Sequence, residues 1–198
     1  MAASNAVPQQ QQQQLNSFID DVKCSKAMDK LVDMKINFLA IDFDQTMIDI
    51  HTGGRWRGTV PELAEHIRPL FLHLVPQATQ RNIRIAIVTF SSQTKSIREV
   101  LDCAFPTISE LIPIRGSDGS WTYAGNGKRG GKQNRMASAA EELMAKPALG
   151  VCDVTKNTTL LIDDDPNNIS ISLKDGTRAV WFNPRHPNRL LDDILRLE

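Results

Sequence analysis

Two aspartates that lie one residue apart follow a short apolar segment of this chain. Residues 36–41 are apolar except for one asparagine, and Asp42 and Asp44 come directly after them. A short apolar run bounded by polar residues is typical of a buried strand in a parallel sheet. Side chains at positions i and i+2 of a strand point to the same side, so we expect both carboxylates to project from its carboxyl end. Because neighbouring carboxylates repel each other, the pair predicts a metal site, an acid–base pair, or both.

A second acidic segment repeats this arrangement. Residues 159–162 form another strand pattern, and Asp163, Asp164 and Asp165 follow it. Asp165 precedes a proline, and we expect it to begin a helix, where a carboxylate offsets the helix dipole. Asp163 and Asp164 can meet the first pair of carboxylates if the two strands are neighbours. Strand length favours Asp163 as the direct metal ligand, and Asp164 is the alternative.

Residues suited to binding an anion lie between the two acidic segments. Residues 83–88 predict another buried strand, which ends in Thr89, Phe90 and Ser91. A hydroxyl followed by free backbone N–H groups at a strand-to-helix turn can bind an anion. Lys132 opens a predicted helix, where the helix dipole disfavours a cation. A bound anion would explain this lysine, and a solvated side chain is the alternative.

Two glycine-containing segments predict loops near the site. Gly53 and Gly54 predict a hairpin or flap over the end of the first strand, which makes His51 and Trp56 candidates for substrate contact. For His51, a place in a surface loop is at least as good an interpretation. Residues 125–132 resemble a phosphate-binding loop but lack its Lys-Ser/Thr ending and its preceding strand, which excludes a nucleoside-triphosphate loop. Basic residues that could bind additional anionic groups, or simply be solvated, are Arg55, Arg57, Lys128 and Arg129.

The remaining segments alternate between helical and strand patterns. We expect helices over residues 15–33, 59–81 with a restart at Pro69, 92–101, 132–146 and 187–197, and strands over residues 111–114 and 178–182, with a weaker strand pattern at 121–123. Strands that alternate with helices predict a parallel sheet between two helical layers. The fold class is therefore α/β, a three-layer α/β/α Rossmann-like domain.

Composition limits the protein's class and partners. The chain has 198 residues, which suits one domain over residues 15–198, and the glutamine-rich residues 1–14 predict a disordered tail. Lys+Arg and Asp+Glu both number 23, so no net charge attracts nucleic acid or a membrane. The three cysteines are widely spaced, and neither a bilayer-spanning segment nor a signal-peptide pattern is present. These features predict a protein of the reducing cytoplasm.

In their order along the chain, these motifs resemble the four motifs of the haloacid dehalogenase superfamily. The resemblance covers about residues 36–182 and is greatest to the compact magnesium-dependent phosphatases. It implies that Asp42 is the nucleophile, which forms an aspartyl-phosphate, and that Asp44 is the general acid and base. It also implies that Thr89 and Lys132 bind the phosphoryl group, and that Asp42, the backbone carbonyl of Asp44, and Asp163 hold Mg²⁺.

The chemistry of these residue types is consistent with that resemblance. A carboxylate that attacks an anionic phosphoryl group is repelled by it, and Mg²⁺ and an ammonium group reduce this repulsion. The spans on either side of Thr89 leave room for a small flap but for no large cap domain. The sequence thus predicts a Mg²⁺-dependent phosphomonoester hydrolase for a phosphorylated small molecule or a phosphoprotein. The alternatives are a catalytically silent phospholigand-binding or scaffold protein, and a phosphotransferase or phosphomutase that uses the same residues.

Overall fold

A parallel β-sheet forms the centre of the molecule. The computed structural model describes residues 9–123, 130–146 and 153–198, with side chains from residue 21 onward. The sheet has five strands in the order β3-β2-β1-β4-β5, and all neighbouring strands are parallel. The strands are β1 (Phe38–Ile41), β2 (Arg84–Val88), β3 (Ile114–Arg115), β4 (Thr159–Asp163) and β5 (Arg178–Trp181).

Alternate residues of the central strands supply two separate hydrophobic cores. Every residue of β1 and β4 is buried. Leu39 and Ile41 contribute to the larger core, whereas Phe38 and Ala40 contribute to the smaller core on the opposite face. Such burial on both faces explains why these segments are apolar throughout and do not alternate with polar residues.

Helices cover both faces of the sheet. The larger core includes buried residues of α1 (Gln9–Asp33), α3 (Pro69–Gln80), α4 (Thr94–Ala104) and α7 (Arg189–Leu195). The smaller core lies against α5 (Gln133–Met144) and α6 (Pro166–Lys174), and the short α2 (Val60–Ala64) packs on α4. The three layers confirm the predicted Rossmann-like α/β/α fold. In the part of the chain that the structure describes, no helix is long and apolar enough to cross a membrane.

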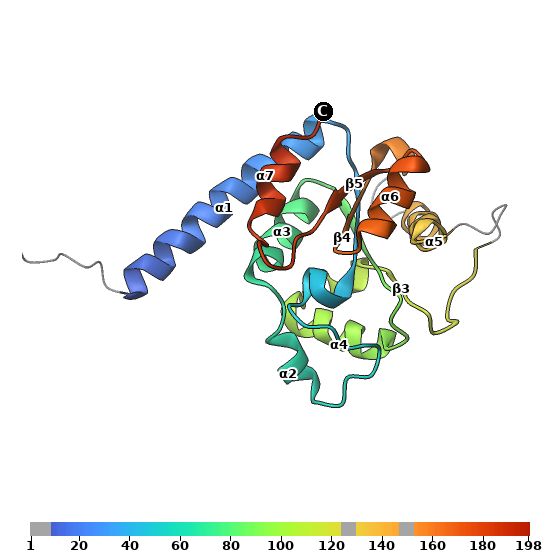
Figure 1. Ribbon diagram of the computed structural model, residues 1–198, viewed down its shortest axis with the longest axis horizontal. Helices are drawn as coiled ribbons and strands as arrows, with labels where there is room; N and C mark the ends of the chain where they lie inside the picture. Colours follow the sequence, from blue (N-terminus) through green and yellow to red (C-terminus); the bar gives the residue numbers. More distant parts are fainter. Residues whose placement is uncertain (1–8, 124–129, 147–152) are drawn as a thin grey trace, which may run out of the picture.

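The first helix is longer than the sequence pattern predicted. It begins at Gln9 and so includes the glutamine tract, which we expected to be disordered. Glutamine has a good intrinsic helix propensity, so the tract can extend a helix that forms for other reasons. Cys24, Met28 and Leu31 are fully buried and anchor the carboxyl-terminal half of the helix on the domain. The amino-terminal half projects away from it (Figure 1).

Three local expectations need correction. The third strand lies at Ile114–Arg115 and not at residues 111–114, where Ser109–Leu111 forms a short 3₁₀ helix and Pro113 has no N–H to donate. Residues 121–123 do not form a strand, and the Trp121 indole donates to the Gly116 carbonyl at 2.8 Å. Of the expected hairpin or flap, the hairpin is wrong, because residues 49–58 form a loop without strands, with positive φ at Gly53 and Gly54.

The strand order of the sheet creates a switch point between two neighbouring strands. From β1 the chain adds β2 and β3 on one side, and it then crosses back to add β4 and β5 on the other side of β1. The strand order therefore reverses between β1 and β4. In open α/β sheets, ligands bind in the crevice beyond the carboxyl ends of the strands at such a switch point.

Candidate active site

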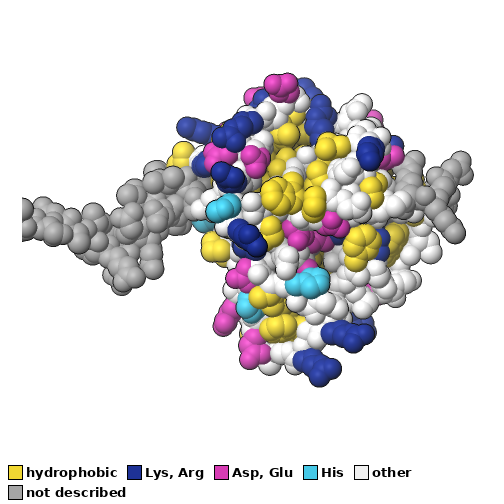
Figure 2. Space-filling view, in the orientation of Figure 1, with side chains coloured by type: hydrophobic (Ala, Val, Ile, Leu, Met, Phe, Trp, Pro, Cys, Tyr) yellow, Lys and Arg dark blue, Asp and Glu magenta, His cyan; other side chains and the backbone are white. Residues whose placement is uncertain are grey.

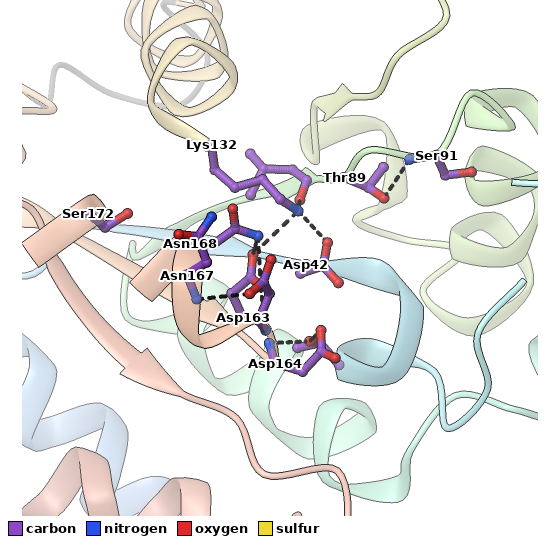
Figure 3. Close-up of polar contacts among 12 residues, drawn as sticks. Asp42, Thr89, Ser91, Lys132, Asp163, Asp164, Asn167, Asn168 and Ser172 are labelled. Carbon is purple, nitrogen blue, oxygen red and sulfur yellow. Dashed lines mark hydrogen bonds and ion pairs between the residues drawn. The ribbon is translucent and has the colours of Figure 1, made fainter. Parts of the chain in front are cut away.

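Three carboxylates converge at this switch point. Asp42 directly follows β1, Asp163 is the last residue of β4, and Asp164 comes next. The two strands pair so that Ile41 lies beside Ile162, which places the acidic residues at equal height. One carboxylate oxygen from each aspartate lies within 4.8 Å of the others, and the side chains approach one another in Figure 3.

The backbone conformation that places Asp44 at the site differs from the extended strand that we expected. The strand ends at Ile41, and residues Phe43–Met47 form a tight π-type turn, so the extended i and i+2 arrangement does not apply. The Asp44 carboxylate accepts a hydrogen bond from the Thr52 backbone N–H at 2.8 Å. Among the described residues, the carboxylates that can share one cation are those of Asp42, Asp163 and Asp164, without that of Asp44. Asp44 nevertheless borders the same cavity as Asp42.

Lys132 brings a buried ammonium group to these carboxylates. It lies at the amino-terminal end of α5, where the sequence pattern placed it, and its side chain is only 1 % exposed. Its Nζ donates to Asp42 and to the Val88 carbonyl oxygen at the end of β2, and lies 3.3 Å from Asp163 Oδ2. The lysine therefore joins the ends of three neighbouring strands.

The charges of the cluster do not balance. Three carboxylates face one ammonium group, and burial disfavours the charged forms of Asp42 and Asp164. Burial, together with the neighbouring Asp163 and Asp164, raises the pKa of Asp42 to about 7, although Lys132 opposes this shift. Burial and the charge of Asp163 also raise the pKa of Asp164. A divalent cation would neutralise the excess negative charge.

The structure adds two positioning residues that the sequence analysis did not identify. Asn168 in the first turn of α6 is buried, and its Nδ2 donates to both carboxylate oxygens of Asp163 at 3.1 Å. The Thr46 hydroxyl donates to Asp164 Oδ1 at 3.2 Å and accepts from the Asp164 N–H at 3.1 Å. A polar residue in the helix turn after a strand-end aspartate is the signal that could have indicated Asn168.

The predicted anion-binding segment follows β2 and borders the same cavity. Thr89 is buried, and its Oγ1 accepts a hydrogen bond from the Ser91 N–H at 3.1 Å. Phe90 is 51 % exposed, and the Lys132 Nζ lies 4.8 Å from its ring centroid. This segment thus lies beside the ammonium group that contacts Asp42, and Thr89, Phe90, Ser91 and Lys132 border one cavity.

The cavity over the carboxylates has a volume of about 590 Å³. Figure 2 shows acidic side chains gathered near the centre of this face, between hydrophobic side chains. Of the candidate contact residues, His51 and Arg55 border the cavity, whereas Trp56 and Arg57 do not; Lys128 and Arg129 lie outside the described residues. The cavity is lined by Asp42, Asp44, Gln45, His51, Gly53, Gly54, Arg55, Thr89, Phe90, Ser91, Ser92, Lys132, Asp163, Asp164, Asp165 and Asn168.

The fold and the site define a Rossmann-like α/β protein with an acidic cluster and a buried lysine at its switch point. No protein-family model, no curated protein and no solved structure matches the chain. The functional argument therefore depends on the geometry and chemistry of the site.

Proposed function

We propose that this protein is a Mg²⁺-dependent phosphomonoester hydrolase that acts through an aspartyl-phosphate on Asp42. The observation that carries the proposal is the convergence of Asp42, Asp163, Asp164 and the buried Lys132 below an open cavity. Carboxylates for a metal, a carboxylate nucleophile, an ammonium group and a further carboxylate on the cavity wall are the groups that this hydrolysis requires.

The acidic cluster fits an oxygen-ligated divalent cation. Its carboxylate oxygens lie within 4.8 Å of one another, and Mg²⁺ binds oxygen at about 2.0–2.1 Å, so small side-chain movements allow one ion to contact all three. Asp42, Asp163 and Asp164 would hold the ion, together with the backbone carbonyl of Asp44. Bound Mg²⁺ would neutralise negative charge on the carboxylates and on the phosphoryl oxygens.

In the first step, a carboxylate oxygen of Asp42 attacks phosphorus and forms a P–O bond, while the bond from phosphorus to the leaving oxygen breaks. The Lys132 ammonium group, already beside Asp42, stabilises the charge on the phosphoryl oxygens. The Thr89 hydroxyl and the Phe90 backbone N–H would bind those oxygens from the end of β2, while the Ser91 N–H, which donates to Thr89 Oγ1, orients that hydroxyl. Asp44, in its protonated form, gives its proton to the leaving oxygen.

In the second step, water hydrolyses the aspartyl-phosphate. Asp44 is now a carboxylate and takes a proton from the attacking water, whose oxygen forms the new bond to phosphorus. The bond between phosphorus and the Asp42 oxygen breaks, which releases inorganic phosphate and restores the Asp42 carboxylate. The proton that Asp44 acquires prepares it for the next first step, so protons balance over the cycle.

Two further considerations support the proposal. The ordered motifs resemble those of the haloacid dehalogenase superfamily, whose phosphatases use an aspartate nucleophile and Mg²⁺. The described segments between β1 and α5 contain the loop of residues 49–58, helices α2, α3 and α4, and strands β2 and β3, but no additional domain above the cavity. An open cavity would accept a phosphorylated small molecule or a phosphoprotein.

The test is phosphate release from a panel of phosphomonoesters. We expect Mg²⁺-dependent turnover that EDTA abolishes, and Asp42→Asn should remove it because an amide is a poor nucleophile. Asp193→Asn, at a partly exposed position on α7, is the matched control and should retain full activity. A metal fluoride trapped on Asp42 would support the covalent step. Absence of turnover across the panel, with folded protein and Mg²⁺, would refute the hydrolase and favour a phospholigand-binding protein.

A further inference from the structure

The Gln93 side chain connects the two loops that border the cavity. Its Oε1 accepts a hydrogen bond from the Trp56 backbone N–H at 2.8 Å, and its Nε2 donates to the Trp56 carbonyl oxygen at 3.2 Å. Gln93 lies at the amino-terminal end of α4, directly after the proposed phosphate-binding segment. One amide side chain therefore holds both backbone polar groups of Trp56.

The same residue is tied to the phosphate-binding segment by its backbone. The Gln93 N–H donates to the Ser91 hydroxyl at 3.2 Å, and the Ser91 N–H in turn donates to Thr89. The two loops also lie close together at a second point, because a Cβ atom added to Gly54 would lie 3.7 Å from Ser91 Oγ. The loop of residues 49–58 is thus fixed relative to Thr89 and Ser91.

The other end of this connection is Asp44. Thr52 belongs to the loop that Gln93 holds, and its backbone N–H donates to the Asp44 carboxylate. For residues 51–56, the hydrogen bonds to described residues outside the loop run to Asp44, to Gln93 and, through the Trp56 indole, to Thr59. His51, Gly53 and Arg55 are exposed, whereas the Trp56 side chain packs against the larger core and lies edge-on to His66, with ring centroids 5.9 Å apart. Packing therefore holds the loop at Trp56, and the exposed residues before it depend on the hydrogen bonds.

We propose that Gln93 is a positioning residue, which holds the loop of residues 49–58 in place and thereby orients the carboxylate of Asp44 toward the leaving oxygen of the substrate. The proposal rests on the proposed phosphomonoesterase function. Gln93 touches neither the nucleophile nor the metal ligands in the structure, and it acts through Thr52 on the general acid. Losing it should therefore impair proton donation more than phosphoryl binding or nucleophilic attack.

Two aryl phosphates of similar shape separate these effects. p-Nitrophenolate leaves readily without a proton, whereas phenolate needs protonation as the ester bond breaks. In single-turnover measurements with Mg²⁺, we expect Gln93→Ala to slow phenol release roughly tenfold more than p-nitrophenol release, since a general acid contributes about 10²- to 10⁴-fold. Asp44→Asn should show the same selectivity with a larger loss. In steady-state measurements of Gln93→Ala, KM for both esters should change less than kcat.

Two further variants test the mechanism. Gln93→Glu can accept from the Trp56 N–H but cannot donate to its carbonyl oxygen when ionised, so it should fall between Gln93→Ala and the wild type. Gln77→Ala removes a comparable tether, because Gln77 Nε2 donates to Asp21 far from the site, and it should leave both rates unchanged. Equal slowing of both esters in Gln93→Ala would overturn the proposal.

Hydrogen exchange provides a readout that does not require turnover. Gln93→Ala should accelerate exchange of the Thr52 amide proton, while amide protons of β1 and β4 keep their protection. An unchanged exchange rate of the Thr52 amide proton would overturn the proposal that Gln93 holds the loop in place. A wild-type protein that hydrolyses neither ester would instead refute the phosphatase function, and the exchange result would still decide whether Gln93 fixes the loop to Asp44.

Discussion

Asp42 is 6 % exposed, and its carboxyl group lies next to two other carboxylates. Its hydrogen bond with Lys132 compensates only part of the cost of burying a charge. Through this imbalance, the raised pKa keeps the protonated form of Asp42 favoured up to about pH 7 in the folded, metal-free protein. The same imbalance favours cation binding, because a bound divalent ion stabilises the ionised form of the cluster.

This imbalance predicts how the stability of the metal-free protein depends on pH. The pKa of Asp42 is about 7 in the folded protein and near 3.8 in the unfolded chain, so between these values the folded state binds more protons. The contribution of protonated Asp42 to the free energy of unfolding is fully present below about pH 4 and is lost as pH rises through 7. As an upper limit, the loss is about 1.4 kcal/mol for each unit by which folding raises the pKa. In EDTA, urea unfolding should give a lower free energy of unfolding at pH 8 than at pH 5.

Asp42→Asn serves as the control for this prediction. The variant has no carboxyl group at this position, so the decrease between pH 5 and pH 8 should become smaller. The raised pKa of Asp164 acts in the same direction and should leave a residual slope. A slope that is unchanged in Asp42→Asn would show that the pH dependence originates elsewhere in the protein.

Asn168 provides a second prediction at the residue scale. Because its amide donates to both oxygens of Asp163, Asn168→Ala should let this carboxylate rotate away from the cluster. Loss of such a partner to a metal-binding side chain typically lowers metal affinity about 10- to 100-fold. Isothermal titration with Mg²⁺ measures the change. Asn167→Ala is the matched control, because this neighbouring side chain is exposed and only the backbone N–H of Asn167 is used, as donor to the Asp165 carboxylate that caps α6. The Mg²⁺ affinity of Asn167→Ala should equal that of the wild type.

At the scale of elements, the segment after β2 depends on a close approach of two backbones. The Ser91 carbonyl oxygen accepts a hydrogen bond from the Ser117 N–H at 2.9 Å. A Cβ atom at Gly116 would lie 2.5 Å from that oxygen and 2.4 Å from a methyl carbon of Thr94. Only glycine fits here without a shift of the phosphate-binding segment or of α4.

Gly116→Ala should therefore both destabilise the fold and weaken anion binding. Overpacking of this kind typically costs about 1–3 kcal/mol, and a shifted Ser91 would raise KM for a phosphomonoester. Urea unfolding and steady-state kinetics measure the two effects. Gly130→Ala offers a comparison, because its added Cβ would meet Ile171 at an ordinary 3.6 Å and its φ is not positive. Equal changes in the free energy of unfolding and in KM for the two variants would contradict the steric argument.

Strands and helix starts that have a simple physical signal could be predicted from the sequence. Residues of β1, β2 and β4 are buried on both faces, so their continuous apolar runs were diagnostic, and Thr59 and Glu62 form the capping box that begins α2. The turn after β1 had no such signal, because Gln45 adopts φ 59° within it and contacts elsewhere in the fold, such as Arg68 with the Gln45 and Thr46 carbonyl oxygens, hold its shape. The start of α1 was equally indeterminate, since a glutamine tract has no apolar pattern.

At the scale of the whole molecule, strand order determines which residues meet. The sequence indicated that Asp42 and Asp163 end apolar segments, but these residues are far apart in the chain. Their proximity depends on β4 pairing directly with β1, which no local pattern records. Lys132 could be assigned to a helix end, yet its contact with Val88 and Asp42 requires α5 to cover the face opposite α3. The candidate residues were thus accessible to sequence reasoning, and the polar residue after the strand-end aspartate could have indicated Asn168, whereas Gln93 needed the assembled fold.

Because the acidic cluster joins β1 to β4 and Lys132 joins both to β2, cation binding should stabilise the molecule as a unit. Stabilisation by a ligand that binds only the folded state reaches about 2.7 kcal/mol at one hundred times Kd. We expect Mg²⁺ to raise the midpoint of thermal unfolding in proportion to the logarithm of its concentration above Kd, and more strongly at pH 8 than at pH 5. Amide protons of β1, β2 and β4 should gain equal protection. Asp163→Asn should lose this response, while Asp193→Asn keeps it; protection confined to β4 would mean that the cation does not bridge the strands.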